Sequence, residues 1–281
     1  MSEAKPLPEG SYADCPNGYR IHYLDRGEGP VVVFLHGSGP GASGHSNFQG
    51  NYPEWVAAGY RCLVPDMIGF GYSDKPEDVE YPLALFVECL KQTLDVAGVS
   101  RCTIVGNSLG GAVALGLALD YPDLVAGLIL MAPGGMSQRD EYLQMPDMQK
   151  MFEIYMSQGE LTLASMRDLF EFGLVHNPRH VTDELLAQRM HIMALMNIQV
   201  MASMDIPFLP ERLHELKCPV LAFWGANDKM MPDSGLLALT KNCPNMKMLV
   251  LSECGHWAMV EHRELFNRAC LDFLARDVAG N

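Results

Sequence analysis

A serine flanked by glycines is the feature of the sequence that points most directly to chemistry. Gly106, Ser108 and Gly110 lie in the run Gly-Asn-Ser-Leu-Gly, directly after the strand-like run 102–105 and before the helix-like run 109–119. A sharp strand-to-helix turn leaves no room for side chains two residues before and after its central residue. There the serine meets free N–H groups and the positive end of the helix dipole, which favour negative charge. Read alone, the pattern also fits a glycine-rich helix start, but these flanking elements predict that Ser108 is a nucleophile.

A serine hydroxyl is a weak nucleophile and needs a base, and His256 is the best placed of the nine histidines. It follows the strand-like run 248–251, and Asp228 follows the strand-like run 220–223. Because loops at the carboxyl ends of parallel strands converge on one face of a sheet, we expect both side chains to reach Ser108. In such a triad the acid holds the base in one tautomer.

Asp66 is the main rival for the role of the acid. It follows a predicted strand that ends at Pro65, so it also lies at a carboxyl end. However, it precedes Ser108 in the chain, whereas Asp228 lies between the serine and His256. We therefore expect Asp66 to cap a turn or loop.

The loop 36–41, His-Gly-Ser-Gly-Pro-Gly, is expected to stabilise the charge that develops on the substrate oxygen. The backbone N–H groups of Ser38 and Leu109 would face the same point and form an oxyanion hole. Residues 39–44 also match Gly-x-Gly-x-x-Gly, a pattern of dinucleotide sites. Pro40 has no N–H to donate, and no helix with apolar periodicity follows at once, so we prefer the oxyanion interpretation.

The elements that must position these residues alternate along the chain. Strand-like runs and helix-like runs follow one another, which predicts an α/β fold with a mostly parallel sheet covered by helices on both faces. The expected strands are 19–25, 31–35, 60–65, 102–105, 127–131, 220–223 and 248–251, and the expected helices are 86–97, 109–119 and 261–275.

One segment breaks this alternation. Residues 133–210 contain no convincing strand and hold 11 of the 19 methionines of the chain. We predict a core domain formed by 1–132 and 211–281, with 133–210 inserted as a helical lid. Methionines often fill a protein core, but their concentration in one inserted segment favours a lid over an apolar substrate.

Composition narrows the class of protein. The chain has 281 residues, 48% of them hydrophobic, and a formal net charge of −14. An acidic chain is a poor partner for nucleic acids or anionic membranes, and no apolar run is long enough to cross a membrane. Residues 1–10 show no secretory signal, and the eight cysteines are scattered, so we expect a cytoplasmic protein with reduced, mostly buried thiols.

No Walker motif and no zinc-type cluster occurs in the sequence. We therefore expect no metal or other cofactor, and a small molecule as the partner. The sequence does not fix whether the chain forms a homo-oligomer.

Taken together, the motifs at 36–41, 106–111, 225–228 and 255–257 resemble those of the α/β-hydrolases, over nearly the whole chain. A narrower resemblance is to the meta-cleavage product hydrolases, which cut a carbon–carbon bond in vinylogous 1,5-diketones. It is carried by the extended loop 36–48, by the residue before the nucleophile, and by Trp257 after the histidine. This resemblance implies that Arg189 binds the substrate carboxylate. It also assigns substrate contacts to Asn47, Asn107 and Trp257.

The resemblance predicts a C–C hydrolase that acts on 2-hydroxy-6-oxohexa-2,4-dienoates with an apolar 6-substituent. Two alternatives stay open: a carboxylesterase with the same triad, and a ligand-sensing protein of this fold that turns over slowly. Arg189 could also be a surface residue of a lid helix, with Arg167 and Arg179 as rivals. Asn107 could only stabilise the turn, and Trp257 could only pack. Phe170 and Phe172 are candidates for the distal subsite.

Overall fold

An eight-stranded sheet forms the centre of the computed structural model, which describes residues 8–156, 162–197 and 199–279. The expectation that no secretory signal is present rests partly on residues 1–7, which lie outside the described residues. The strand order is β1-β2-β4-β3-β6-β7-β9-β10. The strands are β1 Ser11–Asp14, β2 Arg20–Arg26, β3 Val31–Leu35, β4 Arg61–Pro65, β6 Cys102–Asn107, β7 Val125–Met131, β9 Val220–Gly225 and β10 Met246–Leu251.

The predicted mostly parallel sheet is confirmed. β2 pairs antiparallel with β1 and β4, and the other neighbouring strands run parallel. β3, β6 and β9 are buried almost throughout, as expected of β-branched and apolar runs covered on both faces. Every strand predicted from the sequence is present, with its ends shifted by at most two residues.

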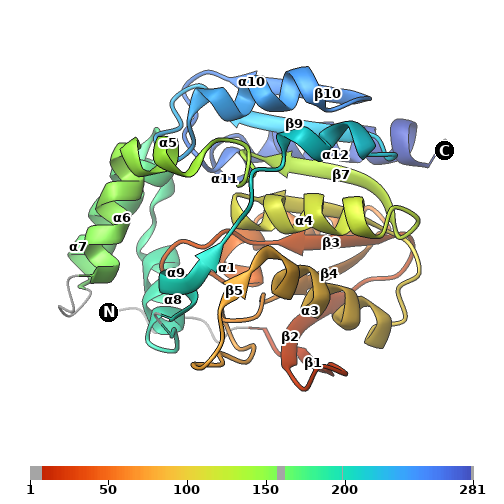
Figure 1. The fold of residues 1–281 in the computed structure, drawn as a ribbon, viewed down its shortest axis with the longest axis horizontal. Coiled ribbons are helices and arrows are strands. Elements are labelled where there is room, and N and C mark those ends of the chain that lie inside the picture. The colour runs from red at the N-terminus through yellow and green to blue at the C-terminus, as the bar shows by residue number, and fades with distance from the viewer. Residues whose placement is uncertain (1–7, 157–161, 198, 280–281) are drawn as a thin grey trace.

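Helices cover both faces of this sheet. α3 and α4 lie in front of it in Figure 1 and α12 lies behind it. Around the sheet are α1 Gly44–Phe48, α2 Tyr52–Ala57, α3 Leu83–Val96, α4 Leu109–Asp120, the 3₁₀ helix η3 Pro210–Glu215, α10 Asp233–Asn242, α11 Ala258–Glu261, α12 Arg263–Phe273 and the π-helical turn η4 Leu274–Val278.

Five of these helices were not predicted: α1, α2, η3, α10 and α11. α1, α2 and α10 are only five, six and ten residues long, too short for a clear apolar period. Tertiary contacts and caps specify them instead: Trp55 of α2 packs against Phe34 and Phe266, and the Ser43 hydroxyl caps α1. A helix does follow the loop, since α1 begins at Gly44, but at five residues it has no clear apolar period, as expected from the sequence.

The segment 133–210 is largely helical and lies to one side of the sheet, as Figure 1 shows. It contains α5 Arg139–Gln144, α6 Pro146–Met156, α7 Leu163–Leu169, the π-helical turn η1 Phe170–Leu174, the 3₁₀ turn η2 Pro178–His180, α8 Asp183–Met193 and α9 Gln199–Ser203. It also contains the two-residue strand β8 Met204–Asp205, which pairs with β5 Tyr81–Pro82, so the expectation of a segment without strands was wrong at this point. Its role as a lid on a core of 1–132 and 211–281 stays a prediction.

Candidate active site

Ser108 stands at the turn between β6 and α4 in a conformation that few residues adopt. Its φ is 55° and its ψ is −116°, and the residue is 8% exposed. A positive φ in a non-glycine residue costs of order 1–3 kcal/mol and is typical of functional sites. A Cβ on Gly106 would lie 2.4 Å from Gly110 O, and one on Gly110 would lie 2.2 Å from Leu35 O. Glycine at both positions is therefore required for the turn that presents Ser108.

His256 and Asp228 form the hydrogen-bonded pair that the sequence predicted. His256 Nδ1 lies 2.8 Å from Asp228 Oδ2, and both side chains are almost fully buried. The other carboxylate oxygen, Oδ1, accepts hydrogen bonds from the backbone N–H groups of Met230 and Met231, at 2.8 and 3.0 Å. The carboxylate is thereby fixed in place, and its Oδ2 can orient the imidazole.

The turn that carries Ser108 lies against the loop of His256. Asn107, the residue before the serine, places its Nδ2 3.5 Å from His256 O and 3.3 Å from Met131 O, and it is completely buried. Its Oδ1 has no hydrogen-bond partner in the described part of the chain. These two N–H contacts to main-chain oxygens correspond to the turn-stabilising interpretation of Asn107, and a contact between its amide and the substrate stays a prediction.

The loop after β3 is held beside the serine by a neutral histidine. The backbone N–H of Met67 donates to His36 Nε2 at 3.0 Å, and His36 Nδ1 lies 2.7 Å from Gly37 O. Burial lowers the pKa of His36 to about 4, so the ring stays uncharged at neutral pH and can accept the Met67 bond.

This loop and the first residue of α4 lie on either side of the serine. A Cβ on Gly37 would lie 3.3 Å from Ser108 Cβ, which puts the 37–38 peptide next to the nucleophile. Leu109 is buried directly after Ser108, and Ser38 is half-buried. The oxyanion role of the Ser38 and Leu109 N–H groups stays a prediction.

Arg189 of α8 is buried although its side chain is a cation. It is 1% exposed, and its Nη2 donates to Asn47 Oδ1 at 2.6 Å. The guanidinium carbon lies 4.9 Å from the centroid of the Trp257 ring and 5.5 Å from that of Phe170. The backbone of α8 also touches the loop after β3, since a Cβ on Gly41 would lie 2.0 Å from Arg189 O. The interpretation of Arg189 as a surface residue was therefore wrong.

The two rival arginines lie elsewhere. Arg179 is exposed, and Arg167 is paired with Glu171 and Asp183 on the surface of the lid segment. Of the two phenylalanines considered for the distal subsite, Phe170 packs against Trp257 at 5.3 Å between ring centroids. Phe172 is 42% exposed and lies under two lysine side chains instead.

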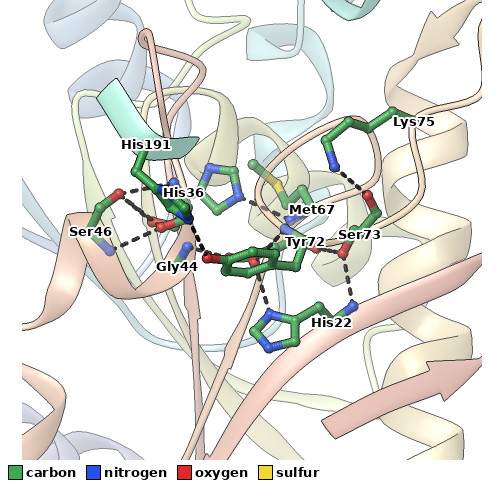
Figure 2. Close-up of polar contacts among 11 residues, drawn as sticks. His22, His36, Gly44, Ser46, Met67, Tyr72, Ser73, Lys75 and His191 are labelled. Carbon is green, nitrogen blue, oxygen red and sulfur yellow. Dashed lines mark hydrogen bonds and ion pairs between the residues drawn. The ribbon is translucent and has the colours of Figure 1, made fainter. Parts of the chain in front are cut away.

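Asp66 belongs to a second histidine–aspartate pair, away from Ser108. Its Oδ2 lies 2.8 Å from His22 Nδ1 and accepts from the Tyr72 N–H at 3.0 Å, and its Oδ1 accepts from the Gly44 N–H at 2.8 Å. Figure 2 shows Ser73 linked to the backbone of His22. Asp66 thus ties β2, the loop after β4 and the start of α1 together, which is the loop-capping role expected from the sequence.

Glu261 is a site residue that the sequence did not single out for a role. Its carboxylate accepts from the Gly255 N–H at 2.6 Å, and from the N–H groups of His176 and Asn177 at 2.8 and 2.9 Å. It therefore clamps the loop that carries His256 to the helical segment 133–210. In the sequence, the role of Glu261 is indicated only by an acidic side chain close to the loop of His256. Its partner His176 lies 85 residues away in the chain, and such a contact cannot be recognised from one sequence.

In the ranges 8–156, 162–197 and 199–279, no group of three or more His, Cys, Asp or Glu side chains is arranged to hold a metal ion. No helix in the same ranges has the length and apolar character needed to cross a membrane. All eight cysteines are buried free thiols, as predicted.

Comparison with known proteins identifies the family to which the chain belongs. The family described as alpha/beta hydrolase fold matches residues 30–263. The chain is 37% identical over 273 residues to 2-hydroxy-6-oxo-6-phenylhexa-2,4-dienoate hydrolase of Burkholderia cepacia, with 92% of each chain covered. It is also 37% identical over 273 residues to 2-hydroxy-6-oxononadienedioate/2-hydroxy-6-oxononatrienedioate hydrolase of Comamonas testosteroni, again with 92% of each covered.

Among solved structures, the chain is similar to a meta-cleavage product hydrolase from Pseudomonas fluorescens IP01, a variant in complex with acetates. The TM-score is 0.82 at 27% sequence identity, and 95% of this chain and 97% of that chain are covered. The similarity therefore extends over the sheet and the helical segment 133–210 alike.

Proposed function

Because the chain belongs to the α/β-hydrolase family, and within it to the meta-cleavage product hydrolases, we propose that it hydrolyses a carbon–carbon bond in 2-hydroxy-6-oxohexa-2,4-dienoates. The substrate carries an apolar 6-substituent. With one water molecule the reaction gives 2-hydroxypenta-2,4-dienoate and a carboxylic acid, as a step in the degradation of aromatic compounds.

The proposed reaction has a requirement that ester hydrolysis does not share. An ester loses an alkoxide, whereas here a carbon fragment must leave, and it leaves readily only if its electron pair is delocalised. Ketonisation of the dienol before cleavage allows the fragment to leave as a dienolate. A cation that binds the carboxylate of this fragment stabilises the developing charge.

Each residue then has one role. His256 moves the proton for ketonisation and activates the Ser108 hydroxyl, which attacks the C6 ketone. Backbone N–H groups of Ser38 and Leu109 stabilise the oxyanion. The bond between C5 and C6 breaks, the dienoate leaves, and His256 activates the water that releases the acid from Ser108. Asp228 orients His256 throughout.

The observation that carries this proposal is the buried guanidinium of Arg189. Its Nη2 donates to Asn47 Oδ1, and the Trp257 ring centroid lies 4.9 Å from its guanidinium carbon, so the buried cation is held beside other residues of the candidate site. Its planar fork of donors matches a carboxylate, the anionic group that the dienoate carries. A simple esterase has no use for a cation in this position.

The test compares two substrates in two variants. Arg189→Ala is expected to lower kcat/KM for the 6-phenyl dienoate by about 100-fold or more, the typical loss for a buried charge-assisted contact. Hydrolysis of p-nitrophenyl esters should stay within about threefold, as should both activities of the control Arg179→Ala. Equal losses on both substrates, or no loss on either, would favour the carboxylesterase. Steady multiple turnover of the coloured dienoate excludes a slow ligand-sensing protein.

A further inference from the structure

A carboxylate on helix α6 is buried without any hydrogen-bond donor. Asp147 is 0% exposed, and neither of its side-chain oxygens has a hydrogen-bond partner in the described part of the chain. Burial raises the pKa of this carboxyl to about 6, so the group is mostly ionised at neutral pH. An unpaired buried charge costs several kcal/mol. Buried polar groups in native proteins are nearly always satisfied by protein, water or ligand, so this one calls for a partner.

Asp147 lies beside the wall of the candidate active site. A Cβ on Gly173 would lie 2.6 Å from Asp147 Cγ, so the carboxyl packs against the backbone of η1. The same short element supplies Phe170, which packs on Trp257, and Leu174, whose carbonyl accepts from the Trp257 N–H at 3.1 Å. The carboxyl is therefore separated from the loop of His256 by a single turn of backbone.

The charges around Asp147 place it at one end of the site. The charged groups that act on it are Lys229, Asp228, Lys150 and His256. Arg189 donates to Asn47 and Pro40 on the loop after β3, and its guanidinium also lies near the ring of Phe170 in η1. With the dienoate carboxylate on Arg189, we place the substituent on the other side of the scissile bond next to the part of η1 that packs against Asp147.

The two neighbouring lysines do not satisfy this carboxyl. Lys150 Nζ forms an ion pair with Asp168 at 2.5 Å. Lys229 Nζ donates to Phe172 O at 2.9 Å. Both ammonium groups lie over the ring of the exposed Phe172, at 4.7 and 4.2 Å from its centroid. They lower the cost of the charge on Asp147 from a distance but leave its oxygens available to another donor.

We propose that Asp147 is a specificity-determining residue that accepts a hydrogen bond from a hydroxyl or amino group on the acyl-side substituent of the substrate. The inference rests on the proposed function and refines it: the 6-substituent has an apolar body, such as a phenyl ring, and carries a donor. A substituent that ends in a carboxylate is disfavoured, because its charge would meet that of Asp147.

The experiment measures kcat/KM for 6-phenyl, 6-(hydroxyphenyl), 6-(aminophenyl) and 6-(2-carboxyethyl) dienoates, with the ring donor at each position. The wild type is expected to prefer the best hydroxyphenyl or aminophenyl substrate over the phenyl one by about tenfold or more, the value of one charge-assisted hydrogen bond. Asp147→Leu should remove this preference, and Asp147→Asn should reduce it and raise the rate for the carboxyethyl substrate. Asp140→Leu and Asp140→Asn, at an exposed lid aspartate, should change none of these ratios.

A second series separates this inference from the proposed function. Phenyl esters of benzoic, hydroxybenzoic and aminobenzoic acids place the same acyl groups next to Ser108 without a dienoate. If no dienoate is cleaved but the ester series shows the donor preference and its loss in Asp147→Leu, the proposed function fails and the subsite stands. If the ratios in both series are the same in the wild type and the Asp147 variants, the subsite is overturned. Should Asp147→Leu not fold, Asp147→Asn, which keeps the shape of the side chain, decides in the same way.

Discussion

Two regions of this molecule contain the same buried pair of side chains. His256 Nδ1 lies 2.8 Å from Asp228 Oδ2 at the candidate active site, and His22 Nδ1 lies 2.8 Å from Asp66 Oδ2 on the other side of the loop after β3. Each carboxylate also accepts two backbone N–H groups. The geometry of the pair therefore does not decide whether it takes part in catalysis.

What differs is the surroundings of the imidazole. The loop of His256 contacts Asn107, the neighbour of the nucleophile. The ring of His22 instead faces a backbone, because a Cβ on Gly10 would lie 2.1 Å from His22 Nε2. In the described part of the chain, this nitrogen forms no hydrogen bond to a hydroxyl. We expect a histidine–aspartate pair to act as a catalytic base only where the fold brings a nucleophile to its second nitrogen, as proposed for His256, and otherwise to tie elements together.

The largest expected effect is a loss of kcat that distinguishes His256 from His22. His256→Ala should lower kcat by about 10⁴-fold or more, since triad members act as a unit. His22→Ala should keep kcat within about tenfold but lower the free energy of unfolding by about 3 kcal/mol, as expected when one partner of a buried pair is removed. Steady-state kinetics and urea unfolding measure both. A loss of kcat in His22→Ala as large as that in His256→Ala would remove the distinction.

Asp66→Asn tests the structural pair through its pH dependence. Burial alone would raise the pKa of Asp66, but the hydrogen bond and charge of His22, with smaller contributions from His36 and the Tyr72 N–H, hold it below its usual value. A lowered pKa in the folded state contributes stability above the unfolded value of about 4, which is lost as pH falls through the folded pKa. The variant should be less stable by about 2–3 kcal/mol at pH 7, with a gap that closes below about pH 4. A gap that does not change between pH 7 and 3 would contradict this.

The clamp on the loop of His256 should have a smaller effect. Glu261→Gln replaces a charged acceptor of three backbone N–H groups by a neutral one. We expect a loss of about 1–2 kcal/mol in unfolding free energy and a rise of a few-fold in KM, with kcat less affected. The exposed Glu264 serves as a control, since Glu264→Gln should change neither quantity. An unchanged KM in Glu261→Gln would show that the lid segment does not depend on this contact.

The smallest expected effect is a gain in the free energy of unfolding, whereas the preceding variants lose stability. Within the described residues, the buried Asp147 carboxyl accepts no hydrogen bond from a histidine or a backbone N–H. The charged groups that act on it are Lys229, Asp228, Lys150 and His256. Because its folded pKa of about 6 lies above the unfolded value, ionisation destabilises the fold at neutral pH and not in acid. Asp147→Asn should therefore raise the unfolding free energy by about 1 kcal/mol at pH 8, and by nothing near pH 4. Destabilisation at pH 8 would contradict this sign.

The sequence predicted the features that are encoded locally. The turn around Ser108 depends on glycines two residues to either side, and the positions of Asp228 and His256 depend on the strands that directly precede them. The resemblance to a family then identified Arg189, whose helical neighbourhood alone fits a surface residue equally well. The pairing of Asp228 with His256 and of Asp66 with His22 agrees with the choice of Asp228 over Asp66, and the role of Asp228 as the acid stays a prediction.

The features that were missed depend on contacts between distant segments. α1 and α2 are specified by a cap and by the packing of Trp55, and neither leaves a periodic pattern in so short a run. Asp147 reads as an ordinary acidic residue in the first turn of a helix. Its packing against Gly173 and its lack of a hydrogen-bond partner among the described residues appear only in the folded chain.

The most direct test of the account is the turnover of the 6-phenyl dienoate by Ser108→Ala. The account predicts that the variant still binds the substrate, seen as a shift of its visible absorption on mixing, while the release of benzoate falls by about 10⁴-fold or more. Release of benzoate at a rate close to that of the wild type would contradict it, because Ser108 would then not be the nucleophile.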